Sequence, residues 1–175
     1  MIAPSSSPIP RLGRHPSRGR VLATPVLTVL IGSTLPALLP IIVQSPTLPP
    51  LGLLFLVGWR LLHPELWPLW IGAPLGLYDD LMSGQAPGSA MFLWSVIMIG
   101  IELLDARMLW RDYWQDWAIA AVACLVFLGG SLLLAHIGGS RAPLHLILPQ
   151  WLWSVLLYPL IVRFIALIDR WRMMA

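Results

Sequence analysis

The stretch Gly76-Leu-Tyr-Asp-Asp-Leu-Met-Ser-Gly-Gln-Ala-Pro-Gly88 lies between two apolar segments of the chain. Its three glycines permit positive φ angles and close approach of backbones, which favours a structural turn. Its adjacent carboxylates, Asp79 and Asp80, could also bind a partner, hold a hard cation or perform acid–base chemistry. No His or Cys lies beside them, and Ser83 has no adjacent base. The pattern therefore predicts a polar turn with solvent-exposed carboxylates, and partner binding is the second interpretation.

The composition around this stretch is that of a membrane protein. Hydrophobic residues make up 58% of the 175 residues, charged residues only 11%, and the mean hydropathy is +0.79. Soluble domains carry roughly 25% charged residues. The basic residues are all Arg and lie mostly at the ends of apolar segments. This dispersed arrangement is typical of the positive-inside rule and argues against nucleic-acid binding, which needs a dense basic patch.

The hydropathy pattern predicts an all-α, polytopic membrane protein with six transmembrane helices. Residues 1–20 form a Pro-, Ser- and Arg-rich tail that we expect to be disordered and cytoplasmic. Residues 21–172 form the membrane domain, with predicted spans at about 21–43, 47–62, 66–78, 88–104, 117–137 and 146–168. The second and third spans are shorter than, or at the lower limit of, the roughly 17–25 residues of an ordinary spanning helix. They are either tilted spans sheltered by longer neighbours or one re-entrant hairpin.

Arginine placement favours six full spans. With six spans and a cytoplasmic N-terminus, ten of the eleven Arg lie on the cytoplasmic side and only Arg141 lies outside. A re-entrant hairpin would move every Arg after residue 78, except Arg141, to the outside. Because Arg in short loops sets orientation, both termini are predicted to be cytoplasmic.

Glu102 is the candidate intramembrane carboxylate, near the cytoplasmic end of the fourth span. A carboxylate inside hydrocarbon is costly and is by default a functional hypothesis. Arg60 and Arg163 are predicted at a similar depth, so either could pair with Glu102. Snorkelling of the two arginines to the interface is the alternative that we favour.

Aromatic residues mark the expected membrane interfaces. Trp110, Tyr113, Trp114 and Trp117 follow a helical spacing in the loop 105–117, which predicts either a short surface helix or a helix end within an aromatic belt. The other tryptophans expected at an interface are Trp59, Trp67 and Trp171.

No constellation in the sequence predicts catalysis, a cofactor or a metal. The four His are scattered, Cys124 is alone within an apolar run, and the chain has no Lys for a phosphate-binding loop. We therefore expect a protein that is not an enzyme.

The order of features resembles the MreD family of rod shape-determining membrane proteins. Pro46-x-x-Pro49 leads into Leu-Leu-Phe-Leu-Val-Gly-Trp59, the turn His63-Pro64-Glu65 and a second short segment. Then follows a glycine, an aspartate four residues later, and glycines four and eight residues further on. The residues that match this pattern are Gly76, Asp80, Gly84 and Gly88, so Asp79 is an incidental neighbour. The resemblance covers about residues 46–90.

This resemblance implies a multi-pass protein of the bacterial inner membrane, surrounded by lipid, that belongs to the cell-elongation (Rod) machinery. The expected partners are an MreC-like periplasmic scaffold, a RodA-like glycosyltransferase, an elongation transpeptidase and, indirectly, an MreB-like actin. The implied fold is similar to the substrate-binding subunit of energy-coupling-factor transporters. Residues implied to serve structure or partner binding are Gly76, Asp80, Gly84, Gly88, Pro46 and Pro49, alongside Glu102, Arg60 and Arg163 from the analysis of charge. The alternative function is a transporter subunit that binds a small vitamin-like molecule.

Overall fold

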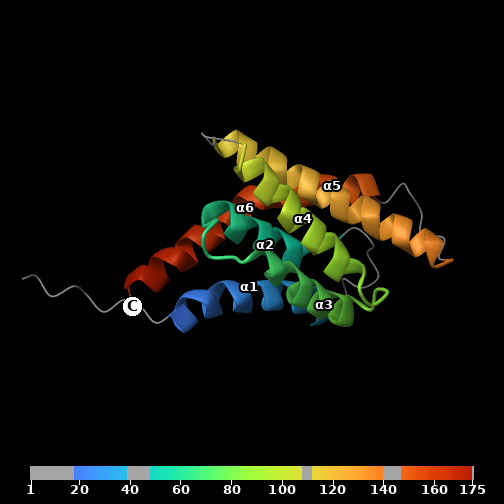
Figure 1. The fold of residues 1–175 in the computed structure, drawn as a ribbon, viewed down its shortest axis with the longest axis horizontal. Coiled ribbons are helices and arrows are strands. Elements are labelled where there is room, and N and C mark those ends of the chain that lie inside the picture. The colour runs from blue at the N-terminus through green and yellow to red at the C-terminus, as the bar shows by residue number, and fades with distance from the viewer. Residues whose placement is uncertain (1–17, 39–47, 108–111, 140–146, 175) are drawn as a thin grey trace, which may run out of the picture.

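The computed structural model describes residues 18–38, 48–107, 112–139 and 147–174. In these residues all regular secondary structure is helical, which confirms the predicted all-α class (Figure 1). The elements are α1 (Arg18–Leu38), α2 (Leu51–Leu62), the short 3₁₀ helix η1 (Leu69–Ile71), α3 (Gly72–Ser83), α4 (Ser89–Asp105), α5 (Tyr113–Ile137) and α6 (Ile147–Met174).

The third helix differs most from its predicted span of 66–78. Residues 66–68 are not helical, η1 follows, and α3 then continues to Ser83. The stretch that we expected to be a turn from Gly76 onward is therefore helical as far as Ser83. Only residues 84–88 form the connection to α4. The predicted turn is wrong here because Asp80 finds hydrogen-bond donors at the start of α4, so its carboxylate does not require a solvent-exposed turn.

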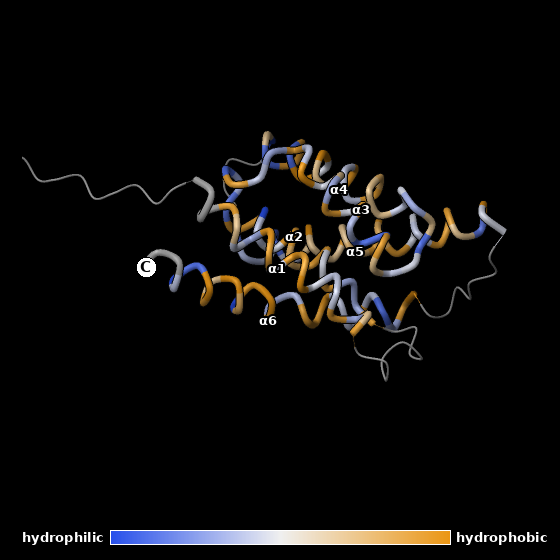
Figure 2. Tube along the Cα trace, turned by 90° about the horizontal axis from the view of Figure 1, so that it is seen from below, coloured by the Kyte–Doolittle hydropathy of each residue, from blue (hydrophilic) through white to orange (hydrophobic). Residues whose placement is uncertain are grey.

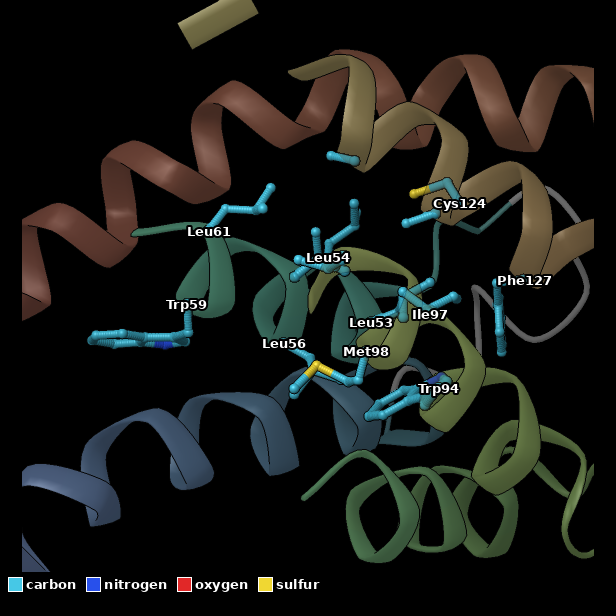
Figure 3. Packing of buried hydrophobic residues seen from close by; sticks show 14 of the residues in the cluster. Leu53, Leu54, Leu56, Trp59, Leu61, Trp94, Ile97, Met98, Cys124 and Phe127 are labelled. Carbon is cyan, nitrogen blue, oxygen red and sulfur yellow. The ribbon is translucent and has the colours of Figure 1, made fainter. Parts of the chain in front are cut away.

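Helix α2 lies at the centre of the bundle, between α1 on one side and α5 and α6 on the other (Figure 1). Nine of its twelve residues are buried. A helix that is apolar on every side is stable only when neighbours cover it all round. Figure 3 shows Leu54 and Leu61 on the side of α2 that faces α6, and Leu56 on the side that faces α1. This short apolar helix of twelve residues is therefore the core of the fold.

Glycines let the other helices approach α2 closely. A Cβ atom at Gly32 of α1 would lie 2.7 Å from a ring carbon of Phe55 and 3.2 Å from the backbone nitrogen of Gly52. A Cβ atom at Gly58 would lie 2.6 Å from Ile165 of α6. These distances are shorter than ordinary packing contacts, so a larger residue at either glycine would require the neighbouring side chains or backbone to shift.

Two of the tryptophans expected at an interface are instead buried. Trp59 is fully buried, and its indole Nε1 donates a hydrogen bond of 2.8 Å to Thr28 Oγ1 of α1. Trp67 is also buried. Trp114 and Trp171 are exposed, as the interface prediction requires. Trp59 lies near the end of α2, but the fold turns it inward because α2 is central.

A separate surface helix, one of the two interpretations of residues 105–117, is absent from the described part of that loop. Helix α4 ends at Asp105 and α5 begins at Tyr113, while Trp110 lies outside the described residues. Tyr113, Trp114 and Trp117 belong to the first turns of α5. Of the two interpretations, the structure has the helix end, with Trp114 packed edge-on against both other rings.

The outer surface of the bundle is strongly apolar. Large hydrophobic side chains are exposed on every α-helix, among them Leu133 and Ile137 of α5 and Leu156 and Leu160 of α6. The tube in Figure 2 is hydrophobic along much of α6. Two helices, Tyr113–Ile137 and Ile147–Trp171, are long and apolar enough to cross a membrane. This surface fits contact with lipid, which does not penalise exposed Leu and Ile.

Candidate functional site

The carboxylate of Asp80 holds the start of α4. Its Oδ2 accepts hydrogen bonds from the backbone N–H of Gly88 (2.9 Å) and of Met91 (3.2 Å). Its Oδ1 accepts from the Ala90 N–H (2.8 Å) and from Ser89 Oγ (2.9 Å). The first N–H groups of a helix have no partner inside the helix and carry its positive dipole end. Asp80 satisfies three of them from a neighbouring helix.

This cap explains why a carboxylate is buried. Asp80 is only 2% exposed, which corrects the expectation that both carboxylates face solvent. An unpaired buried charge would be strongly destabilising, but four donors surround this one. The N-cap position itself is Gly88, which has no side chain to offer α4. Asp80 therefore replaces the missing local cap and joins α3 to α4.

The glycines of the motif contribute to the same contact between α3 and the start of α4. Gly76 lies one helical turn before Asp80, and a Cβ atom there would be 2.6–2.8 Å from backbone atoms of Ala90 and Met91. Gly84 ends α3 with φ of +67°, and Gly88 precedes α4 with φ of +95°. Both angles lie in the left-handed region that favours glycine. The fixed spacing of the four motif residues thus has a separate physical reason at each position.

A second polar cluster lies at the C-terminal ends of α2 and α4, far from the Asp80 cap at the start of α4. The Arg60 side chain is 3% exposed, and its guanidinium donates to Glu102 and to the Pro64 carbonyl oxygen. Asp105 lies 3.3 Å from the same guanidinium. Glu102 therefore pairs with Arg60, and the snorkelling that we favoured does not describe Arg60. Glu102 itself is half-exposed, so one edge of the cluster reaches the surface.

Arg163 does not share the position of Arg60. It is exposed on α6, and the described partner of Glu102 is Arg60. The C-terminal half of α6 instead reaches the end of α2 through His63 Nε2, which lies 3.0 Å from Asp169 Oδ2. The sequence analysis missed this contact, because 106 residues separate its two partners.

The structure also contains a cavity that the sequence did not predict. It has a volume of about 550 Å³ and lies between the C-terminal ends of α1 and α3 and the segment before α2. Its polar lining includes Ser33, Asp79 and Gln150. Pro49 also lines it, whereas Pro46 lies outside the described residues. Asp79, which we interpreted as an incidental neighbour of Asp80, therefore lines a cavity that Asp80 does not line.

Within the described residues no three His, Cys, Asp or Glu side chains come together as a metal site. Comparison with family models, with curated proteins and with solved structures finds no match. The described residues define the class of molecule by their geometry: a helical bundle with an apolar surface, buried polar contacts between helices and a cavity with a polar part.

We expect Asp80→Asn to lower the stability of the bundle by about 2 kcal/mol, because the amide loses the negative charge and turns N–H donors toward the N–H groups of α4. Thermal unfolding in detergent, followed by far-UV circular dichroism, measures this loss. Asp79→Asn removes the adjacent carboxylate, which makes none of the four contacts, and should cost clearly less. Equal losses for the two variants would contradict the capping role.

Gly76→Ala should destabilise the protein by about 1–3 kcal/mol, because the added methyl group meets the backbone of α4. Gly100→Ala is the matched control on α4, where an added Cβ meets nothing within 4 Å. That control should be neutral or stabilising by up to about 1 kcal/mol, because Ala is the better helix former. If the same unfolding assay gave the reverse order, the close approach of α3 and α4 would be wrong.

Arg60→Met should cost about 2–3 kcal/mol, because Glu102, Asp105 and the Pro64 carbonyl oxygen lose their shared donor. Arg163→Met removes the same charge from an exposed position and should change the unfolding temperature little. Parallel thermal melts of both variants test the difference. A loss for Arg163→Met as large as that for Arg60→Met would show that net charge, and not the buried cluster, is responsible.

Proposed function

We propose that this chain is a non-enzymatic membrane subunit of the bacterial cell-elongation (Rod) complex and a member of the MreD family. In this role it supports rod shape and lateral peptidoglycan synthesis by binding partner proteins. The observation that carries the proposal is the motif Gly76, Asp80, Gly84 and Gly88, whose spacing resembles that of the family. Each of its residues has a defined part in the α3–α4 joint. A motif that builds a rigid joint, with no reacting group, is what a scaffold requires.

The proposed setting is the inner membrane, with six spans and both termini in the cytoplasm. The apolar outer surface and the two long apolar helices support membrane insertion. Helices α2 and α3 are short, but α2 is covered by α1, α5 and α6. A buried short helix does not need to match the ~30 Å of hydrocarbon by itself. The distribution of Arg supports the orientation.

The proposed partners are an MreC-like scaffold, the elongation transpeptidase and a RodA-like glycosyltransferase, with an MreB-like actin contacted indirectly. Exposed apolar faces on α5 and α6 offer surfaces for the membrane helices of such partners. Small and branched residues on these faces permit packing within lipid, where van der Waals contact drives helix association.

One observation favours a second function, that of a small-molecule-binding subunit of a transporter. The cavity beside Asp79 is of a size that holds small ligands. In the proposed orientation it lies at the periplasmic end of the bundle, where such a subunit would receive its ligand.

Affinity purification of the tagged chain from a rod-shaped host in mild detergent, with proteomic readout, tests the proposal. We expect recovery of MreC-like and transpeptidase partners. Gly84→Leu should reduce this recovery several-fold, because φ of +67° strains any residue with a side chain. Gly100→Leu, into open space, should retain it. Recovery of ATPase subunits with a tightly bound vitamin would overturn the proposal in favour of the transporter.

A further inference from the structure

The described lining of the cavity beside Ser33, Asp79 and Gln150 carries a negative charge and no positive charge. Asp79 is the one charged residue in its described lining, and the other polar members are Ser33, Ser83, Gln85 and Gln150. The remainder is apolar or glycine, including Leu51, Met82 and Phe127. The segment 39–47, between the two parts of the chain that line one side, contains no charged residue in the sequence. A carboxylate in such a setting attracts a cation and repels an anion.

Two oxygens converge at one point of the cavity wall. A Cβ atom at Gly52 would contact Ser33 Oγ and would lie 3.2 Å from Asp79 Oδ1. Ser33 is 5% exposed, and its hydroxyl lies beside the Asp79 carboxylate. The described lining contains no Arg, Lys or His, so no cation of the cavity wall balances the Asp79 carboxylate. Gly52 keeps this point free of any side chain.

Gln150 holds the cavity open from the side of α6. Its Nε2 donates to the Leu48 carbonyl oxygen, which fixes the segment before α2 against α6. Ser154 Oγ donates to the Gln150 carbonyl oxygen one turn along α6. This part of the wall is therefore held by a contact between α6 and the non-helical segment before α2.

We propose that this cavity binds an organic cation whose ammonium or guanidinium head donates hydrogen bonds to Asp79 and Ser33. The apolar part of the ligand packs against Met82, Phe127 and Leu51. A head group with several N–H donors matches two convergent oxygens, and charge-assisted hydrogen bonds of this kind are the strong ones. The inference rests on the cavity and does not depend on the proposed role in cell elongation. The cation comes either from a free small molecule or from a Lys or Arg side chain of a partner protein.

Isothermal titration calorimetry of the full-length protein in detergent, with n-butylguanidinium and N-butylurea, tests the charge preference. The two probes have nearly the same shape and differ in charge. We expect butylguanidinium to bind about tenfold tighter or more. Equal affinities, or no binding of either probe, would overturn the inference. This comparison uses the unaltered protein, so it does not depend on the folding of any variant.

Variants locate the site. Asp79→Asn should abolish the preference for butylguanidinium, and Ser33→Ala should weaken binding of this probe several-fold. Glu65→Gln removes an exposed carboxylate from the turn after α2 and should leave binding unchanged. Loss of binding with Glu65→Gln equal to that with Asp79→Asn would show nonspecific attraction and contradict the site.

Two further measurements separate the sources of the cation. Native mass spectrometry of the purified protein should show a small-molecule adduct that Asp79→Asn lacks if the ligand is free. If the cation is a side chain of a partner, Asp79→Asn should instead lose a co-purifying protein while the isolated chain carries no adduct. Absence of both effects, with both proteins folded by circular dichroism, would overturn the inference. Failure of the proposed elongation role alone would appear as missing elongation partners with the probe selectivity intact.

Discussion

The fold depends on one constraint, which is that charged and polar groups buried in an apolar bundle need partners inside the protein. Asp80 meets it by accepting hydrogen bonds from the N-terminal groups of α4, so that a carboxylate and a helix end stabilise each other. The joint then fixes how α3 lies on α4, and Gly76 allows the two backbones to touch. In the proposed membrane setting this pairing is more important, because lipid offers no hydrogen bonds to replace a lost partner.

The same constraint acts at the other end of the bundle. Arg60 is buried at the end of α2 and binds Glu102 together with a carbonyl oxygen of the following turn. His63 and Asp169 add a contact between α2 and α6. The central helix is thus held by apolar packing along its length and by polar contacts at its C-terminal end. These contacts restrict how α4 and α6 can slide along α2, which gives an apolar bundle a defined register.

The cavity beside Asp79 departs from this rule. Its carboxylate lies beside the Ser33 hydroxyl and faces a lining without a cation, whereas Asp80 accepts four hydrogen bonds and Arg60 pairs with Glu102. A partly buried carboxylate without a cationic partner in the protein is the reason for proposing a cationic ligand there. Two neighbouring aspartates on one helix therefore have different structural roles, because consecutive helical residues face different directions. Asp80 faces α4 and builds the fold, while Asp79 faces the cavity.

The sequence by itself determined the helical class, the order of the apolar segments, the likeness of the α3–α4 motif to a fixed-spacing signature and the apolar character of the surface. These features are local or compositional, so hydropathy and glycine spacing record them. Only the tertiary structure decided that Asp80 is buried, that Trp59 faces the core, that Arg60 is the partner of Glu102 and that a cavity exists beside Asp79. Each of these depends on which helix lies next to which, and that choice comes from packing between residues far apart in the chain. No local pattern in the sequence contains it.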